Sequence, residues 1–285
     1  MVADIDWDNA DRCLEGAYRK LDRAKVLTEQ IQQRIAEATN PDSYSLRYVA
    51  SNEGRHHEWH LTYINEIDSD ISILLGDALH NYRSALDHVA WELTTLGKGA
   101  TGESTFFPLR LHSRKRRERT STVEVVADSE IVDFIDKLQP FHGAGHNEPL
   151  HTLHALNIHD KHRSVLINVR SVDTAIISLP EGTSIDHSFV WGSNLTRSGL
   201  LMGCDTTLSA DLAVGSDVSL DVFIELDLGE LSRGSTTSAT GTTRLPLESV
   251  LYGIEMAVQV DVLHAANQIF RKRHRHGAGE DLYRF

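Results

Sequence analysis

Cysteine is almost absent from this chain of 285 residues, which contains only Cys13 and Cys204. The two lie far apart in different kinds of segment, so the sequence indicates neither a disulfide framework nor a thiolate zinc site. Long apolar runs are absent as well: no segment approaches the roughly 18 uninterrupted apolar residues of a membrane span. The N-terminus is acidic and does not resemble a signal peptide. We therefore expect a cytoplasmic protein with no membrane partner.

Positive charge is also in short supply, since the formal net charge is −13. Proteins that coat duplex DNA need a broad basic surface to displace phosphate counterions, so broad duplex-DNA binding is excluded. Cations do gather in two runs, over residues 110–119 and 271–276. The second run is typical of a solvated helix end, where cations are favoured. Two local basic runs still permit contact with an RNA or a nucleotide at one face.

Several catalytic motifs are missing too. There is no phosphate-binding Gly-rich loop, no dinucleotide fingerprint after a strand and no Gly-x-Ser-x-Gly elbow. Nucleoside-triphosphate hydrolysis and hydride transfer are therefore not expected, and we predict no cofactor.

Periodicity predicts an α+β fold. Amphipathic patterns predict helices over residues 7–38, 70–96, 129–138 (capped by Ser129), 149–162 and 247–272. Alternating patterns predict a β-hairpin from 44–50 and 56–64, and several antiparallel strands within 165–245, with 230–241 as a flexible loop.

These elements suggest about four main helices around one core, with an antiparallel β-sheet. Because the last helix returns after the strands, we expect residues 1–285 to form a single interlocked unit. Its helical core would comprise 1–162, including the hairpin 44–64, plus 247–276, and its β-rich segment would comprise 165–245. The hairpin is expected to join the sheet of the β-rich segment.

The helix over 70–96 has an unusual polar face. One arc is apolar and predicts burial of Leu75, Leu79, Tyr82, Leu86, Val89 and Leu93. The opposite arc lacks Lys and Glu, the usual residues of a wet helix surface, and carries Asp77, His80, Asn81, Arg83, Ser84, Asp87 and His88. Asp77, Asn81, Ser84 and His88 form one stripe, and His80, Arg83 and Asp87 form the adjoining row. This face is either a functional site or a buried polar network that holds helices together.

Histidines crowd the window 142–162, which contains His142, His146, His151, His154, His159 and His162. Metal binding is one interpretation, but the window has no His-Glu-x-x-His pattern, so we predict no native metal. The end of the helix over 149–162 brings together Asp160, His162 and Arg163. We predict that these three lie near the Arg83/His88 face and bind the same ligand, because the two segments hold the densest short polar chemistry of the chain.

The run Arg83-Ser84-Ala85-Leu86-Asp87-His88 resembles the signature of the HEPN superfamily, in which Arg and a polar residue are followed after three residues by His. These helical-bundle proteins include metal-independent ribonucleases of toxin and antiphage defence systems. The resemblance implies that Arg83 clamps phosphate, Ser84 occupies the polar position and His88 transfers protons, with Asp87 and His80 beside them. The same segment, with residues 138–140 and 156–163, is also similar to a family of uncharacterised bacterial and phage proteins.

Three functional hypotheses follow. The first is a HEPN-like endoribonuclease acting on RNA; Arg83 and His88 lie about 140° apart on one helix, so a homodimer would have to pool two copies. The second is a noncatalytic HEPN-like module that binds a nucleotide or a peptide, or supports assembly. The third is a metal-dependent hydrolase that uses the histidine-rich helix. Convergence of Arg83 and His88 in an open cleft would favour catalysis, and a sealed network would favour a structural role.

Overall fold

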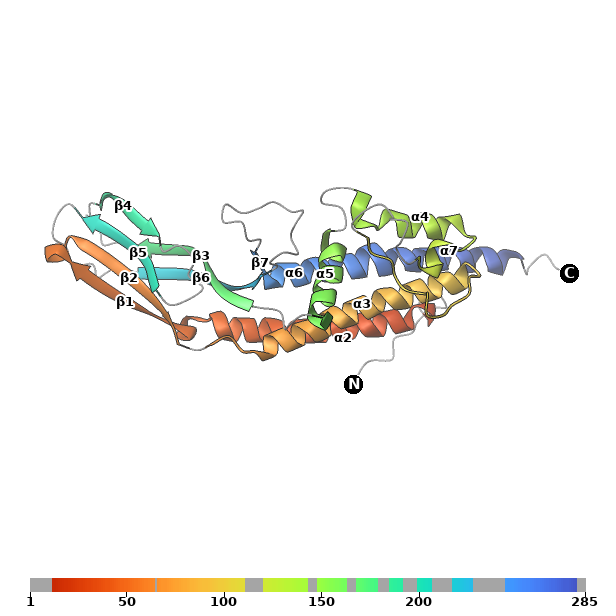
Figure 1. Cartoon of the computed structure of the whole chain (residues 1–285), viewed down its shortest axis with the longest axis horizontal. Coiled ribbons are helices and arrows are strands. Elements are labelled where there is room, and N and C mark those ends of the chain that lie inside the picture. Colours follow the sequence, from red (N-terminus) through yellow and green to blue (C-terminus); the bar gives the residue numbers. More distant parts are fainter. Residues whose placement is uncertain are drawn as a thin grey trace. The chain divides into compact units, whose positions relative to one another are not determined.

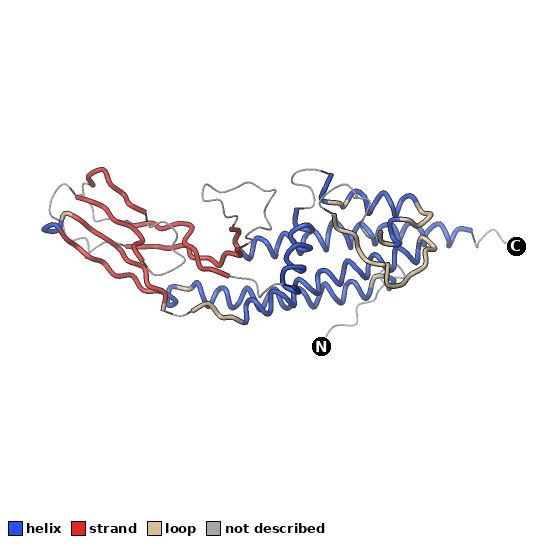
Figure 2. Tube along the Cα trace, in the orientation of Figure 1, coloured by secondary structure: helices blue, strands red, loops and turns tan. Residues whose placement is uncertain are grey.

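The computed structural model describes residues 12–64, 66–110, 120–142, 148–162, 168–178, 185–191, 199–206, 217–227 and 244–280. Helices and strands are both present, and the predicted α+β class is confirmed (Figure 1, Figure 2). No helix among these residues is both long enough and apolar enough to cross a bilayer.

The chain contains two compact units, each built from segments that are far apart in the sequence. The first comprises Met1–Glu29, Leu74–Leu166 and Ser249–Phe285, and the second comprises Gln30–Ile73 and Ile167–Glu248. The physical reason is that the strands bury their apolar side chains against one another. Leu61, Leu201 and Met202 form a separate core, with Val172 and Leu220 packed against it. The hairpin therefore belongs to the β-rich unit and not to the helical core.

The helical elements closely follow the predicted ranges. They are α2 (Glu15–Thr39), α3 (Asp70–Leu96), α4 (Ser129–Lys137), α5 (Glu148–His162), α6 (Leu247–Met256), the π-helix η6 (Ala257–His264) and α7 (Ala265–Glu280). The start of the first predicted helix lies outside the described residues. Two local predictions are wrong. Asp128, and not Ser129, caps α4 by accepting a bond from the Glu130 N–H at 3.1 Å. The last helix also contains the π-helical segment, which apolar periodicity does not reveal.

Helix α3 has the predicted rotation. Leu75, Leu79, Tyr82, Leu86, Val89 and Leu93 are all fully buried. Tyr82 also links three helices of the first unit, since its hydroxyl lies 3.1 Å from Thr28 Oγ1 of α2 and 3.3 Å from Glu255 Oε2 of α6. Burial raises the pKa of Tyr82, so this hydroxyl stays protonated and can donate. The opposite arc of α3 is thereby directed away from the bundle core.

The strands form two antiparallel sheets instead of one. β1 (Tyr44–Ser51), β2 (His56–Tyr63), β5 (Gly199–Thr206) and β4 (Ile185–Trp191) make a four-stranded sheet in that order. β3 (Asn168–Ser178), β6 (Asp217–Asp227) and β7 (Arg244–Pro246) make a three-stranded sheet. The expected pairing of the hairpin with later strands is confirmed by the β2–β5 register, in which His57 faces Cys204. The predicted loop 230–241 lies outside the described residues.

Candidate functional site

Arg83 is the most deeply buried charged group of the predicted site. Its side chain is only 11 % exposed, and its Nη2 donates to Asp87 Oδ1 at 3.0 Å and to the carbonyl oxygen of Phe107. The same Asp87 oxygen accepts the Phe107 N–H at 2.9 Å. Arg83 and Asp87 together fasten residue 107 to helix α3. Burial lowers the pKa of Arg83 while Asp87 opposes the shift, so the guanidinium keeps its charge.

One nitrogen of this guanidinium is left over. Arg83 Nη1 is buried and has no hydrogen-bond partner in the part of the chain that the structure describes. A buried donor without an acceptor carries a desolvation cost of about 1–3 kcal/mol, and more when it is charged. Nη1 is therefore a position where an acceptor would be stabilising.

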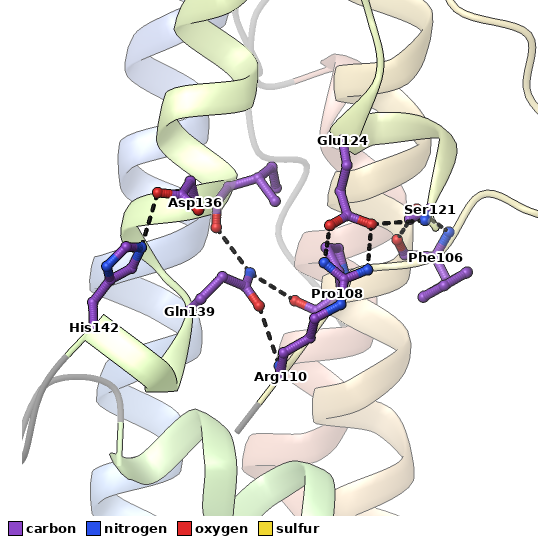
Figure 3. A network of polar contacts seen from close by, with 9 residues as sticks. Phe106, Pro108, Arg110, Ser121, Glu124, Asp136, Gln139 and His142 are labelled. Carbon is purple, nitrogen blue, oxygen red and sulfur yellow. Dashed lines mark hydrogen bonds and ion pairs between the residues drawn. The ribbon is translucent and has the colours of Figure 1, made fainter. Parts of the chain in front are cut away.

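The neighbouring segment 106–110 is held by side chains along its length (Figure 3). Phe106 N donates to Ser121 Oγ at 3.1 Å, and Gln139 Nε2 donates to Pro108 O at 2.9 Å. Arg110 forms a two-pronged pair with Glu124, whose Oε2 accepts from Arg110 Nη2 and from Ser121 N, both at 2.7 Å. The backbone N–H of Arg110 donates to Gln139 Oε1 at 3.2 Å. These bonds fix the carbonyl that Arg83 contacts.

His154 of α5 is a further member of the site. Burial first, and then the charges of Arg83 and His151, lower its pKa to about 4. Its imidazole is consequently neutral at pH 7 and stands close enough to Arg83 to sense the guanidinium charge. Burial also lowers the pKa of His151. A neutral ring can donate from one nitrogen and accept at the other without repelling Arg83.

His88 lies on a different side of α3. Its exposed ring rests against Gly16 of α2, where a Cβ would stand 2.9 Å from His88 Nδ1. Burial raises the pKa values of Cys13 and Glu92, and the charge of Glu92 adds to the shift of Cys13. The thiol of Cys13 is therefore protonated and unreactive. Arg83 and His88 contact different elements, and the chain does not bring them to one point.

Asp160 approaches α3, as predicted, although at a different level from Arg83. A Cβ on Gly76 would stand 2.7 Å from Asp160 Oδ2 and 2.8 Å from Oδ1, so only glycine leaves room for this carboxylate. Gly76 is seven residues before Arg83, about 10 Å along the helix axis. Of its predicted companions, the side chain of His162 and all of Arg163 lie outside the described structure.

The remaining predicted residues line the outer surface of α3. Asp77 and His80 are exposed, and Asn81 and Ser84 are half-buried. Asn81 Nδ2 bonds back to the carbonyl of Asp77 at 2.8 Å, which is a contact within the helix itself. The predicted polar face is thus split into a part around Arg83 and Asp87, which bonds to the 106–110 segment, and an exposed part around Asp77 and His80.

One histidine of the window and two cations of the basic tail form ordinary ion pairs. His142 Nε2 lies 2.8 Å from Asp136 Oδ2, whereas the buried Nδ1 of His159 has no partner among the described residues; His146 lies outside them. No group of three His, Cys, Asp or Glu side chains in the described ranges is arranged to hold a metal ion. Lys272 and Arg273 of the tail pair with acidic residues of α4, at 2.7 Å to Glu130 and 2.6 Å to Asp128.

Sequence reasoning missed two members of the site. His154 was counted in the histidine window but was not assigned to Arg83, because its position depends on the angle at which α5 crosses α3. The 106–110 segment was not recognised as a partner because it binds through backbone groups, which no residue pattern specifies. The buried guanidinium needs an acceptor, and this is the signal that could have prompted a search for one.

Comparisons with protein-family models, with curated proteins and with solved structures find no match for this chain.

Proposed function

We propose that the chain is a noncatalytic HEPN-like module that binds a nucleotide through its phosphate. The observation that carries the proposal is the buried Arg83 Nη1, which has no partner among the described residues and lies in the electrostatic reach of the neutral His154. A phosphate oxygen would supply the acceptor that the guanidinium lacks. A cytoplasmic location, where nucleotides are available, fits this role.

Charge favours an anion at this point. Asp87 compensates Arg83 through a single oxygen, and that oxygen is shared with the Phe107 N–H. Asp87 is also 41 % exposed, so water screens part of its charge. An anion near Nη1 would therefore meet a guanidinium that is only partly neutralised, and hydrogen bonds between Arg and phosphate are among the strongest in proteins.

His154 suits binding better than catalysis. A general acid or base works best when its pKa lies near the working pH, and the pKa of about 4 makes this imidazole a weak base at pH 7. As a neutral ring it can still donate one hydrogen bond to a phosphate oxygen. Burial keeps it uncharged, and this limits its role to recognition.

The ribonuclease hypothesis needs an arrangement in which His88 and Arg83 act on one phosphate. In a single chain His88 lies against Gly16, while Arg83 bonds to Asp87 and to the carbonyl oxygen of Phe107. Endonuclease activity would require a homodimer that supplies His88 from a second copy. For this reason we propose the noncatalytic function and make cleavage an outcome of the test.

Calorimetric titration tests the proposal directly. The full chain is titrated with AMP, ADP, ATP, GMP and inorganic phosphate, and we expect saturable binding of at least one nucleotide. Arg83→Lys keeps the charge but loses the planar fork, so its affinity should fall at least about tenfold. The control variant His80→Gln changes an exposed histidine of the same helix and should bind like the wild type. If no ligand binds at millimolar concentration, or if Arg83→Lys binds unchanged, the proposal is wrong.

A cleavage assay decides between the two functions. Purified protein is incubated with single-stranded RNA in the presence of a chelator, and the products are examined for 2′,3′-cyclic phosphate ends. We expect intact RNA. Cleavage that disappears in both His88→Ala and Arg83→Ala, with unchanged thermal stability, would replace the binding module with a metal-independent endoribonuclease.

A further inference from the structure

The outer face of the four-stranded sheet carries a cluster of histidines and carboxylates. His56, Glu58 and His60 alternate along β2 and therefore lie on one face of the sheet. Asp205 of β5 stands directly opposite His56 in the strand register. We refer to these four residues as the histidine–carboxylate cluster. It belongs to the β-rich unit and is unrelated to the Arg83 site.

Each contact in the cluster joins an imidazole nitrogen to a carboxylate oxygen. His56 Nδ1 lies 2.7 Å from Asp205 Oδ1, and His56 Nε2 lies 3.2 Å from Glu58 Oε1. His60 Nε2 lies 2.9 Å from the other Glu58 oxygen. Glu58 therefore contacts both histidines, and His56 contacts the carboxylates of both Asp205 and Glu58.

The proton inventory of His56 decides its charge. An ionised carboxylate only accepts hydrogen bonds, so both ring nitrogens of His56 must donate. A neutral imidazole has one N–H and can satisfy only one of the two contacts. The observed pair of contacts is complete only when His56 is an imidazolium.

We propose that protonation of His56 strengthens the pairing of strands β2 and β5, so that the histidine–carboxylate cluster makes this sheet sensitive to pH. In the protonated state His56 bonds across the strands to Asp205 and along β2 to Glu58. In the neutral state one ring nitrogen of His56 carries no proton, so its lone pair faces a carboxylate oxygen and that hydrogen bond is lost. The device is a switch in the strength of a strand pair.

Other charged groups around the cluster leave this conclusion unchanged. On β1, Arg47 stands opposite His60 and the uncharged Ser51 stands opposite His56. On β4, Asp186 occupies the register position opposite Asp205. Arg55 at the turn is paired with Glu53 at 3.7 Å. The nearest strands therefore place negative charge beside His56 and positive charge beside His60.

The direction of the pKa shifts agrees with the geometry. Hydrogen bonds to Asp205 first and Glu58 second raise the pKa of His56 above its ordinary 6.5, and bonds to His60 and His56 lower the pKa of Glu58 below 4.5. A raised histidine pKa contributes stability that is complete below 6.5 and is lost as the pH rises through the folded value. A lowered Glu pKa contributes stability that is lost on acidification below 4.5. Pairing of the strands should therefore be strongest between these two values.

His57, the next residue on β2, provides an internal control. It is fully buried, and its Nδ1 and Nε2 lie 2.7 Å from Tyr48 Oη and 3.0 Å from Thr206 Oγ1. Hydroxyl groups both donate and accept, so a neutral His57 satisfies both contacts. Two adjacent histidines on one strand should thus respond to pH in different ways.

Nuclear magnetic resonance on the full-length chain tests the proposal. We expect the ring of His56 to titrate with a midpoint above 6.5. Amide hydrogen exchange along β2 and β5, corrected for intrinsic rates, should be about two- to fivefold slower at pH 6 than at pH 8, the size expected for exposed ion pairs.

The variant Asp205→Asn sharpens the test because an Asn amide can donate to a neutral imidazole. The side chain keeps its size and shape, but a neutral His56 can now satisfy both of its contacts. We expect the His56 midpoint to fall and the pH dependence of β2–β5 exchange to be lost. His142→Gln, which removes a histidine of the other unit whose Nε2 lies 2.8 Å from Asp136 Oδ2, should leave both unchanged. A His56 midpoint at or below 6.5, or equal pH dependence in Asp205→Asn, would overturn the proposal.

Discussion

Arg83 and Arg110 are equally buried, each with 11 % of its side chain exposed, and both fasten the 106–110 segment. They differ in how completely they are paired. Arg110 uses Nη1 and Nη2 on the two oxygens of Glu124, which is itself only 15 % exposed. Arg83 uses Nη2 alone, on a carboxylate that is 41 % exposed, and its Nη1 has no partner among the described residues.

The comparison separates a structural arginine from a candidate binding arginine. In the two-pronged ion pair both Arg110 Nη atoms are engaged by one buried carboxylate that neutralises the charge, as expected of a structural arginine. An incompletely paired guanidinium at equal burial keeps a donor and part of its charge. Burial alone would not distinguish the two, and the hydrogen-bond inventory of each does.

The largest effect is expected from Arg110→Met. This change leaves the buried Glu124 without its cation and should lower the free energy of unfolding by about 3–5 kcal/mol, measured by chemical denaturation. Arg19→Met is the matched control, because Arg19 forms an exposed pair with Glu15 and should cost less than about 0.5 kcal/mol. Equal costs for the two variants would mean that the Arg110 pair is not closed.

Much of the fold follows from the sequence because it depends on local periodicity. The bounds of α3 and the hairpin strands, and burial of the apolar arc from Leu75 to Leu93, were predictable from apolar spacing alone. The split into two sheets was not, because all strands share one alternating pattern and their pairing is decided by distant segments. The roles of Arg83 and His88 also escaped sequence reasoning, since spacing on one helix does not reveal which neighbour each side chain contacts.

Gly76→Ala should have the next largest effect. The added methyl would stand 2.7 Å from Asp160 Oδ2, and displacing this carboxylate should cost about 1–3 kcal/mol in thermal or chemical unfolding. In the background of Asp160→Ala the same change meets no carboxylate and should stabilise the helix by up to about 1 kcal/mol. Additive effects of the two changes would show that α5 does not pack on α3 at this level.

The acid response of His154 should be smaller still, and opposite in sign to that of His56. The pKa of His154 is about 4 in the folded chain and about 6.5 in the unfolded chain. As the pH falls from 6.5 towards 4, His154 therefore binds a proton in the unfolded chain but stays neutral in the folded chain. Stability should decrease over this interval by about 1 kcal/mol, a value reduced for the partial exposure of the ring. His154→Gln should flatten the profile of unfolding free energy against pH. An unchanged profile would mean that burial does not hold His154 neutral in the folded chain.

Arg83→Met is expected to have the smallest effect on stability and the largest effect on binding. Methionine fills a similar volume and removes the buried Nη1 donor, which has no acceptor among the described residues. The Asp87 carboxylate that remains is 41 % exposed, so water can solvate it. The lost bonds to Asp87 and Phe107 are thereby offset, so the free energy of unfolding should fall by less than about 1 kcal/mol, against about 3–5 kcal/mol for Arg110→Met. Nucleotide binding, followed by calorimetric titration of the same folded variant, should disappear. A loss of stability as large as that of Arg110→Met would make Arg83 a second structural arginine and remove the distinction on which the binding proposal depends.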